Sequence, residues 1–178
     1  MHIAMQQELF ELVEKEIRET GMDTASLPGT GGSQVGNTLR VLLPLTDEAH
    51  PAILDIMAAT LNEGTDIIQF YATLTLELGS GREELEKAIP GLNFFCPVGS
   101  FGIFRRAQLY YKYSMLLRES QSAEQLCADV LDTLAAFYQV LDERYPLAMR
   151  LARGEVTFAQ AIQGGELMDP SSESAPNS

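Results

Sequence analysis

The chain has 178 residues, of which 25 are Asp or Glu and 12 are Lys or Arg, so its formal net charge is −13. Nucleic-acid phosphates and anionic lipid headgroups are bound through clustered Lys and Arg, and a surface this acidic repels both. The composition therefore argues against direct nucleic-acid binding and against membrane binding. It favours a basic protein partner, although the same acidity also suits a chain that only needs to stay soluble.

The length fits one domain, which we expect over residues 1–165. Residues 166–178 are polar and rich in Ser and Pro, a composition that predicts a disordered tail. Cys96 and Cys127 lie far apart with no second Cys close to either, so neither a disulfide framework nor a zinc site is expected. No signal peptide and no run of roughly 18 to 20 apolar residues is recognisable, which predicts a cytoplasmic protein.

The first half of the chain predicts a helix followed by three strands. Residues 6–20 place apolar side chains at helical spacing, and the Gly- and Ser-rich residues 23–37 predict a loop. Residues 38–45, 52–62 and 65–78 are extended, mostly apolar runs. The last run alternates between apolar and more polar side chains, which is typical of an antiparallel sheet covered on one side only.

The second half predicts a short helix, two more strands and a long helix. Ser80 and Glu83 have the spacing of a capping box for a helix that ends near Pro90 and Gly91. A ragged strand is expected from Asn93 to Phe104, because Pro and Gly interrupt it, and a regular strand over residues 107–117.

The long helix, residues 122–145, has the clearest period in the chain. Ser122 and Gln125 form a capping box at its start. Pro146 lacks a backbone N–H and is expected to kink or interrupt the helix before further turns up to residue 163. The apolar stripe, which we expect to form the core, consists of Leu126, Val130, Leu134, Phe137 and Leu141.

These elements predict the fold class. We expect a single α+β domain with an antiparallel sheet of about five strands and a long C-terminal helix packed on one face. The predicted order is α-β-β-β-α-β-β-α.

Three local strings imitate catalytic or phosphate-binding motifs. Residues 47–50 spell Asp-Glu-Ala-His, the box of one helicase class, but the chain has no phosphate-binding Gly-Lys-Ser/Thr loop. Residues 29–37 are Gly-rich but lack the Lys and follow a helix, so a connector is expected. Residues 98–102 lack the first Gly of a nucleophile elbow, and Ser100 is predicted to be a turn residue.

The rest of the sequence offers few candidate catalytic residues. The two histidines, His2 and His50, lie at the terminus and before a Pro, where a base oriented by an acid is hard to assemble. The numerous carboxylates fall on predicted solvated helix faces. We therefore name no catalytic, cofactor-binding or metal-binding residue, and we expect no cofactor.

One stretch departs from the acidic composition. Between Phe101 and Arg118 there is no Asp or Glu, while Arg105, Arg106, Lys112 and Arg118 make the predicted hairpin locally basic. Two interpretations stay open, and we favour the first. The hairpin could complement acidic helices packed near it, or it could contact an acidic segment, including one on a second copy of the chain.

The order of elements and one passage carry a family resemblance. The passage is QLYYKYSMLLRESQSAEQLCADVLDTLAAFYQVL, residues 108–141, an aromatic and aliphatic strand that leads through a Ser-capped turn into an amphipathic helix. From about Gln6 to Arg153 the chain resembles the YbjN family, whose fold is similar to that of type III secretion chaperones. The resemblance implies a non-enzymatic protein, often a homodimer, that holds a segment of a client protein.

Two functions follow as expectations. The first is a chaperone-like or adaptor protein that binds a client, which the negative charge suggests is basic; an open sheet edge could accept an added client strand. The alternative is a regulatory or sensory module that binds a small ligand between sheet and helix. An enzyme is a distant third. We also expect a homodimer, because the first helix and an edge strand offer more apolar surface than one long helix covers.

Overall fold

The computed structural model describes residues 3–27, 35–45, 52–62, 65–75, 78–94, 96–105, 108–117 and 121–168. Its helices are α1 (Ile3–Glu19), α2 (Arg82–Phe94), α3 (Ala123–Arg153) and α4 (Phe158–Gln163). Its strands are β1 (Thr24–Leu27), β2 (Val35–Leu43), β3 (Ala52–Asn62), β4 (Thr65–Thr75), β5 (Ser100–Phe104) and β6 (Gln108–Leu116). The predicted α+β class with a single antiparallel sheet is confirmed.

The strands form one sheet of six strands, not five, in the order β1-β2-β3-β4-β6-β5, and every neighbouring pair is antiparallel. The additional strand is β1, which lies in a segment that we predicted to be a loop. It is short and polar, and it carries no apolar alternation that would mark it as a strand. Instead, the Glu14 carboxylate on α1 accepts hydrogen bonds from Thr24 and Ser26 of β1. β2 also starts earlier than predicted, at Val35, and residues 28–34 lie outside the described part.

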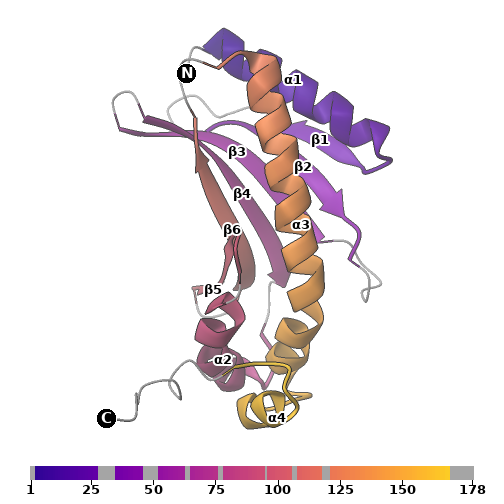
Figure 1. Cartoon of the computed structure of the whole chain (residues 1–178), viewed down its shortest axis with the longest axis vertical. Helices are drawn as coiled ribbons and strands as arrows, with labels where there is room; N and C mark the ends of the chain where they lie inside the picture. Colours follow the sequence, from indigo (N-terminus) through magenta and orange to yellow (C-terminus); the bar gives the residue numbers. More distant parts are fainter. Residues whose placement is uncertain are drawn as a thin grey trace, which may run out of the picture.

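One face of the sheet is covered by helices, and none of the described helices lies on the other face. In Figure 1, α3 crosses the length of the sheet on one side. Helix α1 lies beside the first half of α3, and α2 and α4 lie at the C-terminal end of α3. Alternate residues of the central strands point into this helical layer and are almost fully buried. They include Leu39, Val41, Leu54, Ile56, Ile68, Phe70, Leu109 and Tyr111. The alternation predicted for the third strand is confirmed.

The helix α3 supplies most of the cover. Its capping box between Ser122 and Gln125 is present, and all five residues of the predicted stripe are buried. Of the two outcomes expected at Pro146, a kink or an interruption, the interruption is wrong, because α3 continues to Arg153. The buried side chains of Tyr145, Leu147 and Ala148 on either side of the proline offset the hydrogen bond that it cannot make.

The helix α2 differs from its prediction at both ends. The N–H of Leu85 donates to the carbonyl of Gly81, so the helix begins one residue later than a Ser80 cap requires, and Ser80 instead approaches the carbonyl of Arg153. The helix also passes Pro90 and ends at Phe94. Its last turn is held by Asn93, whose side-chain amide makes two hydrogen bonds with the backbone of Phe101 on β5.

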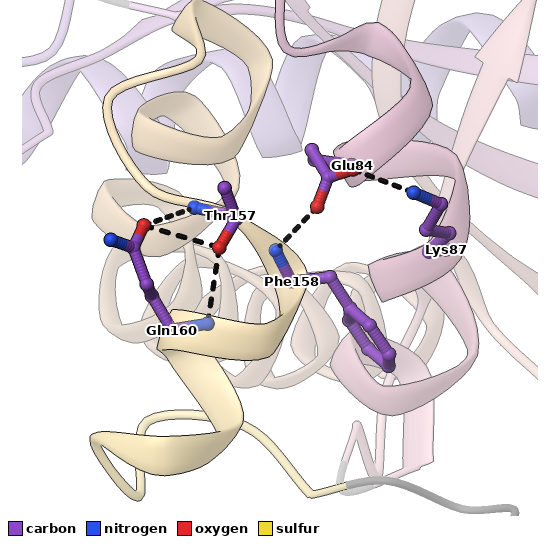
Figure 2. Close-up of polar contacts among 5 residues, drawn as sticks. All are labelled: Glu84, Lys87, Thr157, Phe158 and Gln160. Carbon is purple, nitrogen blue, oxygen red and sulfur yellow. Dashed lines mark hydrogen bonds and ion pairs between the residues drawn. The ribbon is translucent and has the colours of Figure 1, made fainter.

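The C-terminal end of the described chain returns to α2. Helix α4 starts with a capping box between Thr157 and Gln160 (Figure 2), within the residues where we expected further helical turns. Beyond it, Glu166 pairs with Arg150 at 2.6 Å and Leu167 is buried, while residues 169–178 lie outside the described part. Within the described residues, no helix is long and apolar enough to cross a membrane.

Candidate functional site: the uncovered face of the sheet

The face of the sheet opposite the helices is the candidate site, and we call it the open face. The strand registers align its residues in rows across the sheet, for example Arg40, Asp55, Tyr71 and Lys112. Its members across the four strands β2, β3, β4 and β6 are Thr38, Arg40, Leu42, Ile53, Asp55, Met57, Ala59, Ile67, Gln69, Tyr71, Thr73, Tyr110, Lys112, Ser114 and Leu116.

The open face is more apolar than a sheet face that only meets water. An antiparallel sheet covered on one side normally alternates apolar side chains inward with polar ones outward. Here large apolar side chains also point outward, including Leu42, Ile53, Met57 and Leu116. Ile53 and Leu116 are 38% and 67% exposed. An apolar surface of this kind, rimmed by polar groups, is typical of a protein contact site.

Two tyrosines stack on the open face, on the neighbouring strands β4 and β6. The rings of Tyr71 on β4 and Tyr110 on β6 stack with centroids 5.1 Å apart and planes 22° apart. The ammonium of Lys112 lies 5.5 Å from the Tyr110 ring. Burial raises the pKa of Tyr71, and the neighbouring Tyr110 raises it further, so the phenol stays protonated at neutral pH. Stacked tyrosines offer a rigid surface with few rotatable bonds, which suits contact with another polypeptide.

The polar residues of the open face satisfy one another. Arg40 on β2 and Asp55 on β3 form a bidentate ion pair, with nitrogen–oxygen distances of 2.8 and 3.0 Å. The Gln69 amide donates to the hydroxyl of Ser114 at 3.2 Å. Because these groups are already partnered, they stiffen the face and offer no activated nucleophile or base.

The charge of the protein is divided between its two sides. Five acidic residues belong to α1, three to α2 and five to α3. The charged residues of the open face are Arg40, Asp55 and Lys112, so two cations face one carboxylate. Seven Lys or Arg residues also belong to these helices, so the three helices together carry −6 of the net charge of −13, while the open face carries +1.

Two of the four basic residues of the hairpin, Arg105 and Lys112, make no ion pair with the described part of the acidic helices, contrary to the interpretation that we favoured. Lys112 lies on the side of the sheet away from them, and its charge contacts the Tyr110 ring. Arg105, at the turn after β5, lies 5.1 Å from the centre of the Phe104 ring. Neither makes an ion pair with any residue of the described ranges. Arg106 and Arg118 lie outside those ranges.

Of the three motif-like strings, only residues 98–102 lie entirely within the described part of the chain. We predicted that Ser100 is a turn residue, and this is wrong. Ser100 is the first residue of β5 and pairs with Lys112. The Asp-Glu-Ala-His string, both histidines and most of the Gly-rich loop lie outside the described residues. Within the described residues, no group of three or more His, Cys, Asp or Glu side chains could hold a metal ion.

The two cysteines are free thiols. Cys127 is buried in the core and Cys96 is half-buried beside Tyr111. Burial raises the pKa of both thiols, which lowers the fraction of reactive thiolate at neutral pH.

The space between sheet and helices is filled under α1 and α3, but a hollow of about 350 Å³ lies between α1 and the strands β1 and β2. It is lined by Gln7, Phe10, Glu11, Glu14, Ser26, Leu27, Asn37 and Thr38. The narrow gap lined by Leu9, Phe10, Val13, Ile56, Ile68 and Val130 has no room for a water molecule. A ligand there would have to displace packed side chains.

Fold and site together define a class of protein: a one-sided α+β sheet domain whose uncovered face has the composition of a contact surface. No protein-family model and no curated protein matches the sequence. Among solved structures, the chain is similar to the crystal structure described as "YbjN, a putative transcription regulator from E. coli". The identity is 13%, the match covers 90% of this chain and 96% of that one, and the TM-score is 0.40. The likeness is distant, and similarity to type III secretion chaperones stays a prediction.

Proposed function

We propose that this chain is a non-enzymatic protein-binding module that holds a partner polypeptide against the open face. The observation that carries the proposal is the apolar outward side of the sheet, which presents the stacked Tyr71 and Tyr110 and the exposed Ile53. Burying such side chains under a partner contributes about 25 cal/mol for each Å² of apolar surface removed from water.

A basic client fits the charge distribution at long range. The acidic residues of α1, α2 and α3 attract a positively charged polypeptide and raise its rate of association. The nearly neutral open face then makes contact through apolar side chains. Added salt should therefore slow association more than it speeds dissociation.

A homodimer is part of the proposal, but not for the reason given by the sequence. The apolar side of α1 is already covered within the chain, since Leu9, Phe10, Val13 and Ile17 are all buried. Two copies would meet through the open face in the absence of a client, so a client and a second copy exclude each other there. Light scattering over a range of concentrations tests this, and a monomer at every concentration would refute the dimer.

The client proposal is tested by capture with two variants of equal charge. Ile53→Glu places a carboxylate on the open face, whereas Ala135→Glu places one on the exposed side of α3. We expect the wild type and Ala135→Glu to capture the same stoichiometric partner from a lysate of the source cells, and Ile53→Glu to lose it. Equal recovery by all three proteins, or repeated recovery of nothing, would overturn the proposal.

A further inference from the structure

The strand β6 is longer than the edge strand beside it. β5 pairs with residues 108–112 of β6, and the pairing ends at Ser100 opposite Lys112. Residues 113–116 of β6 pair with β4 on their other side. Figure 1 shows this end of β6 extending well past β5. On its outer side, no described strand pairs with Tyr113–Leu116, a segment that we call the β6 edge.

β5 stops because the chain before it leaves the plane of the sheet. Gly99 has φ +85°, a left-handed conformation that favours glycine, and a Cβ at this position would lie 2.6 Å from the Tyr111 ring. The Tyr111 hydroxyl donates to the carbonyl of Val98. The chain therefore passes over Tyr111 on the helical side, so it cannot continue beside β6.

The hydrogen-bond register shows which backbone groups the β6 edge presents. The N–H of Leu117 donates to the carbonyl of Asp66 on β4 at 3.0 Å. Residues of an antiparallel strand direct their N–H and C=O groups alternately to the two sides. Since Leu117 bonds to β4, so do Met115 and Tyr113, and the backbone groups of Ser114 and Leu116 point away from β4.

Within the described residues, nothing gives the β6 edge the usual protection of an exposed strand. Natural sheets block such edges with Lys, Pro, a bulge or a covering loop, because an open edge recruits other chains. The segment Tyr-Ser-Met-Leu has no charge and no proline, and Leu116 is 67% exposed. Beside it lies a hollow of about 340 Å³, lined by residues 96–97 and 99–100 and by Lys112, Tyr113 and Ser114. This hollow lies in the line that a strand continuing β5 would follow.

The charge at this site favours an acidic occupant. Lys112, at the start of the edge, is exposed and has no ion-pair partner among the described residues, and no Asp or Glu occurs between Phe101 and Arg118. A second copy of the chain would bring the same basic segment and repel it. The acidic helices lie on the opposite side of the sheet, and screening over a Debye length of about 8 Å weakens their field at the edge.

We propose that the β6 edge binds one extended segment of an acidic partner polypeptide as an added seventh strand. Its backbone bonds to Ser114 and Leu116, a carboxylate lies beside Lys112, and an apolar side chain enters the hollow. The inference rests on the proposed function, because it names the segment by which a client is held. It adds that this segment is acidic even where the rest of the client is basic.

Amide hydrogen exchange of the full chain, read residue by residue by NMR, tests the geometry. In the free protein, the amides of Ser114 and Leu116 should exchange much faster than those of Tyr113, Met115 and Leu117. The probe is an eight-residue peptide of alternating Val and Glu with blocked ends. It should slow exchange at Ser114 and Leu116, whereas the same peptide with alternate N-methylated amides, or with Lys in place of Glu, should not. Slow exchange at Ser114 and Leu116 in the free protein, or no effect of the acidic peptide, would overturn the inference.

Two variants separate strand addition from docking on the open face. Ser114→Pro removes the hydroxyl and an N–H that points away from β4, whereas Ser114→Ala removes the hydroxyl but keeps the N–H. We expect Ser114→Pro and Lys112→Glu each to weaken the acidic peptide about tenfold or more, and Ser114→Ala to leave it unchanged. If a captured client is lost with Ile53→Glu but retained by Ser114→Pro, strand addition is wrong and the proposed function stands.

Discussion

The carboxylate of Glu84 on α2 accepts the backbone N–H of Phe158 at 2.8 Å and the ammonium of Lys87 at 2.6 Å (Figure 2). One side chain thus joins two helices whose contacting residues are 74 positions apart in the sequence. The N–H groups in the first turn of a helix have no partner inside it, so a carboxylate at this place is favourable. Lys87 and then the N–H of Phe158 lower the pKa of Glu84 below its ordinary value of 4.5.

The first prediction is that the docking of α4 on α2 depends on pH through Glu84. Because the pKa is lowered in the folded state, the stabilisation is present at neutral pH and is lost as the pH falls below 4.5 and through the lowered pKa. NMR titration of the Glu84 side chain should show this shift, and exchange of the Phe158 amide should accelerate over the same range. Glu84→Gln should speed that exchange already at neutral pH, whereas Glu83→Gln, on the neighbouring exposed residue, should not. Equal exchange in both variants would contradict the assignment.

The second prediction concerns the strand that the sequence did not reveal. Glu14 is 18% exposed and receives hydrogen bonds from Thr24 and Ser26 of β1 in addition to its ion pair with Arg18. Glu14→Ala removes all three contacts, so it should destabilise the protein by about 1–3 kcal/mol and speed amide exchange in β1. Glu11→Ala, one turn earlier on an exposed position, should cost less than about 0.5 kcal/mol. Urea unfolding of the two variants decides between them.

The third prediction separates backbone strain from steric clash at two glycines. Gly21 and Gly99 have nearly the same φ, +86° and +85°, but a Cβ at Gly21 meets nothing within 4 Å while one at Gly99 meets the Tyr111 ring at 2.6 Å. Gly21→Ala should therefore cost about 1–2 kcal/mol for the left-handed backbone alone. Gly99→Ala should cost a further ~1–3 kcal/mol, because the buried ring cannot move away. Equal free energies of unfolding would mean that Tyr111 rearranges freely.

The sequence predicts those elements whose apolar period is long enough to be read. The stripe of α3 from Leu126 to Leu141 and the alternation of β4 are both found as predicted. It does not predict β1, because Thr24–Leu27 joins the sheet through backbone pairing and polar contacts with Glu14. The end of α2 was also predicted too early. Its last turn is held by hydrogen bonds between Asn93 and Phe101, and Phe101 belongs to a strand later in the chain.

The candidate site is predictable only in part. The alternation shows that one side of the sheet is uncovered, but the stacking of Tyr71 on Tyr110 depends on the register between β4 and β6. The β6 edge depends on the place where β5 stops, which Gly99 and Tyr111 fix through a contact across the hairpin. The basic hairpin was visible in the sequence. The sequence did not show on which side of the sheet its basic side chains lie, and this led to the wrong interpretation of Lys112.

The last prediction concerns the two prolines that the helices tolerate. Proline inside a helix is about 3 kcal/mol less favourable than alanine, both because it lacks an N–H donor and because its ring crowds the preceding turn. Pro90 of α2 is exposed, whereas Pro146 of α3 is half-buried and contributes packing. Pro90→Ala should therefore stabilise the protein by up to about 3 kcal/mol, and Pro146→Ala by less.

The matched control is Pro97, an exposed proline that lies between α2 and β5. There the fixed φ restricts the unfolded chain without breaking a helix, so Pro97→Ala should destabilise the protein by about 0.4–1 kcal/mol. Thermal unfolding measures all three changes, since 1 kcal/mol shifts the melting temperature of a domain of this size by roughly 2–4 °C. A lower melting temperature for Pro90→Ala would show that the proline stabilises this end of α2, in which case the helix continues past residue 90 because of the proline and not in spite of it.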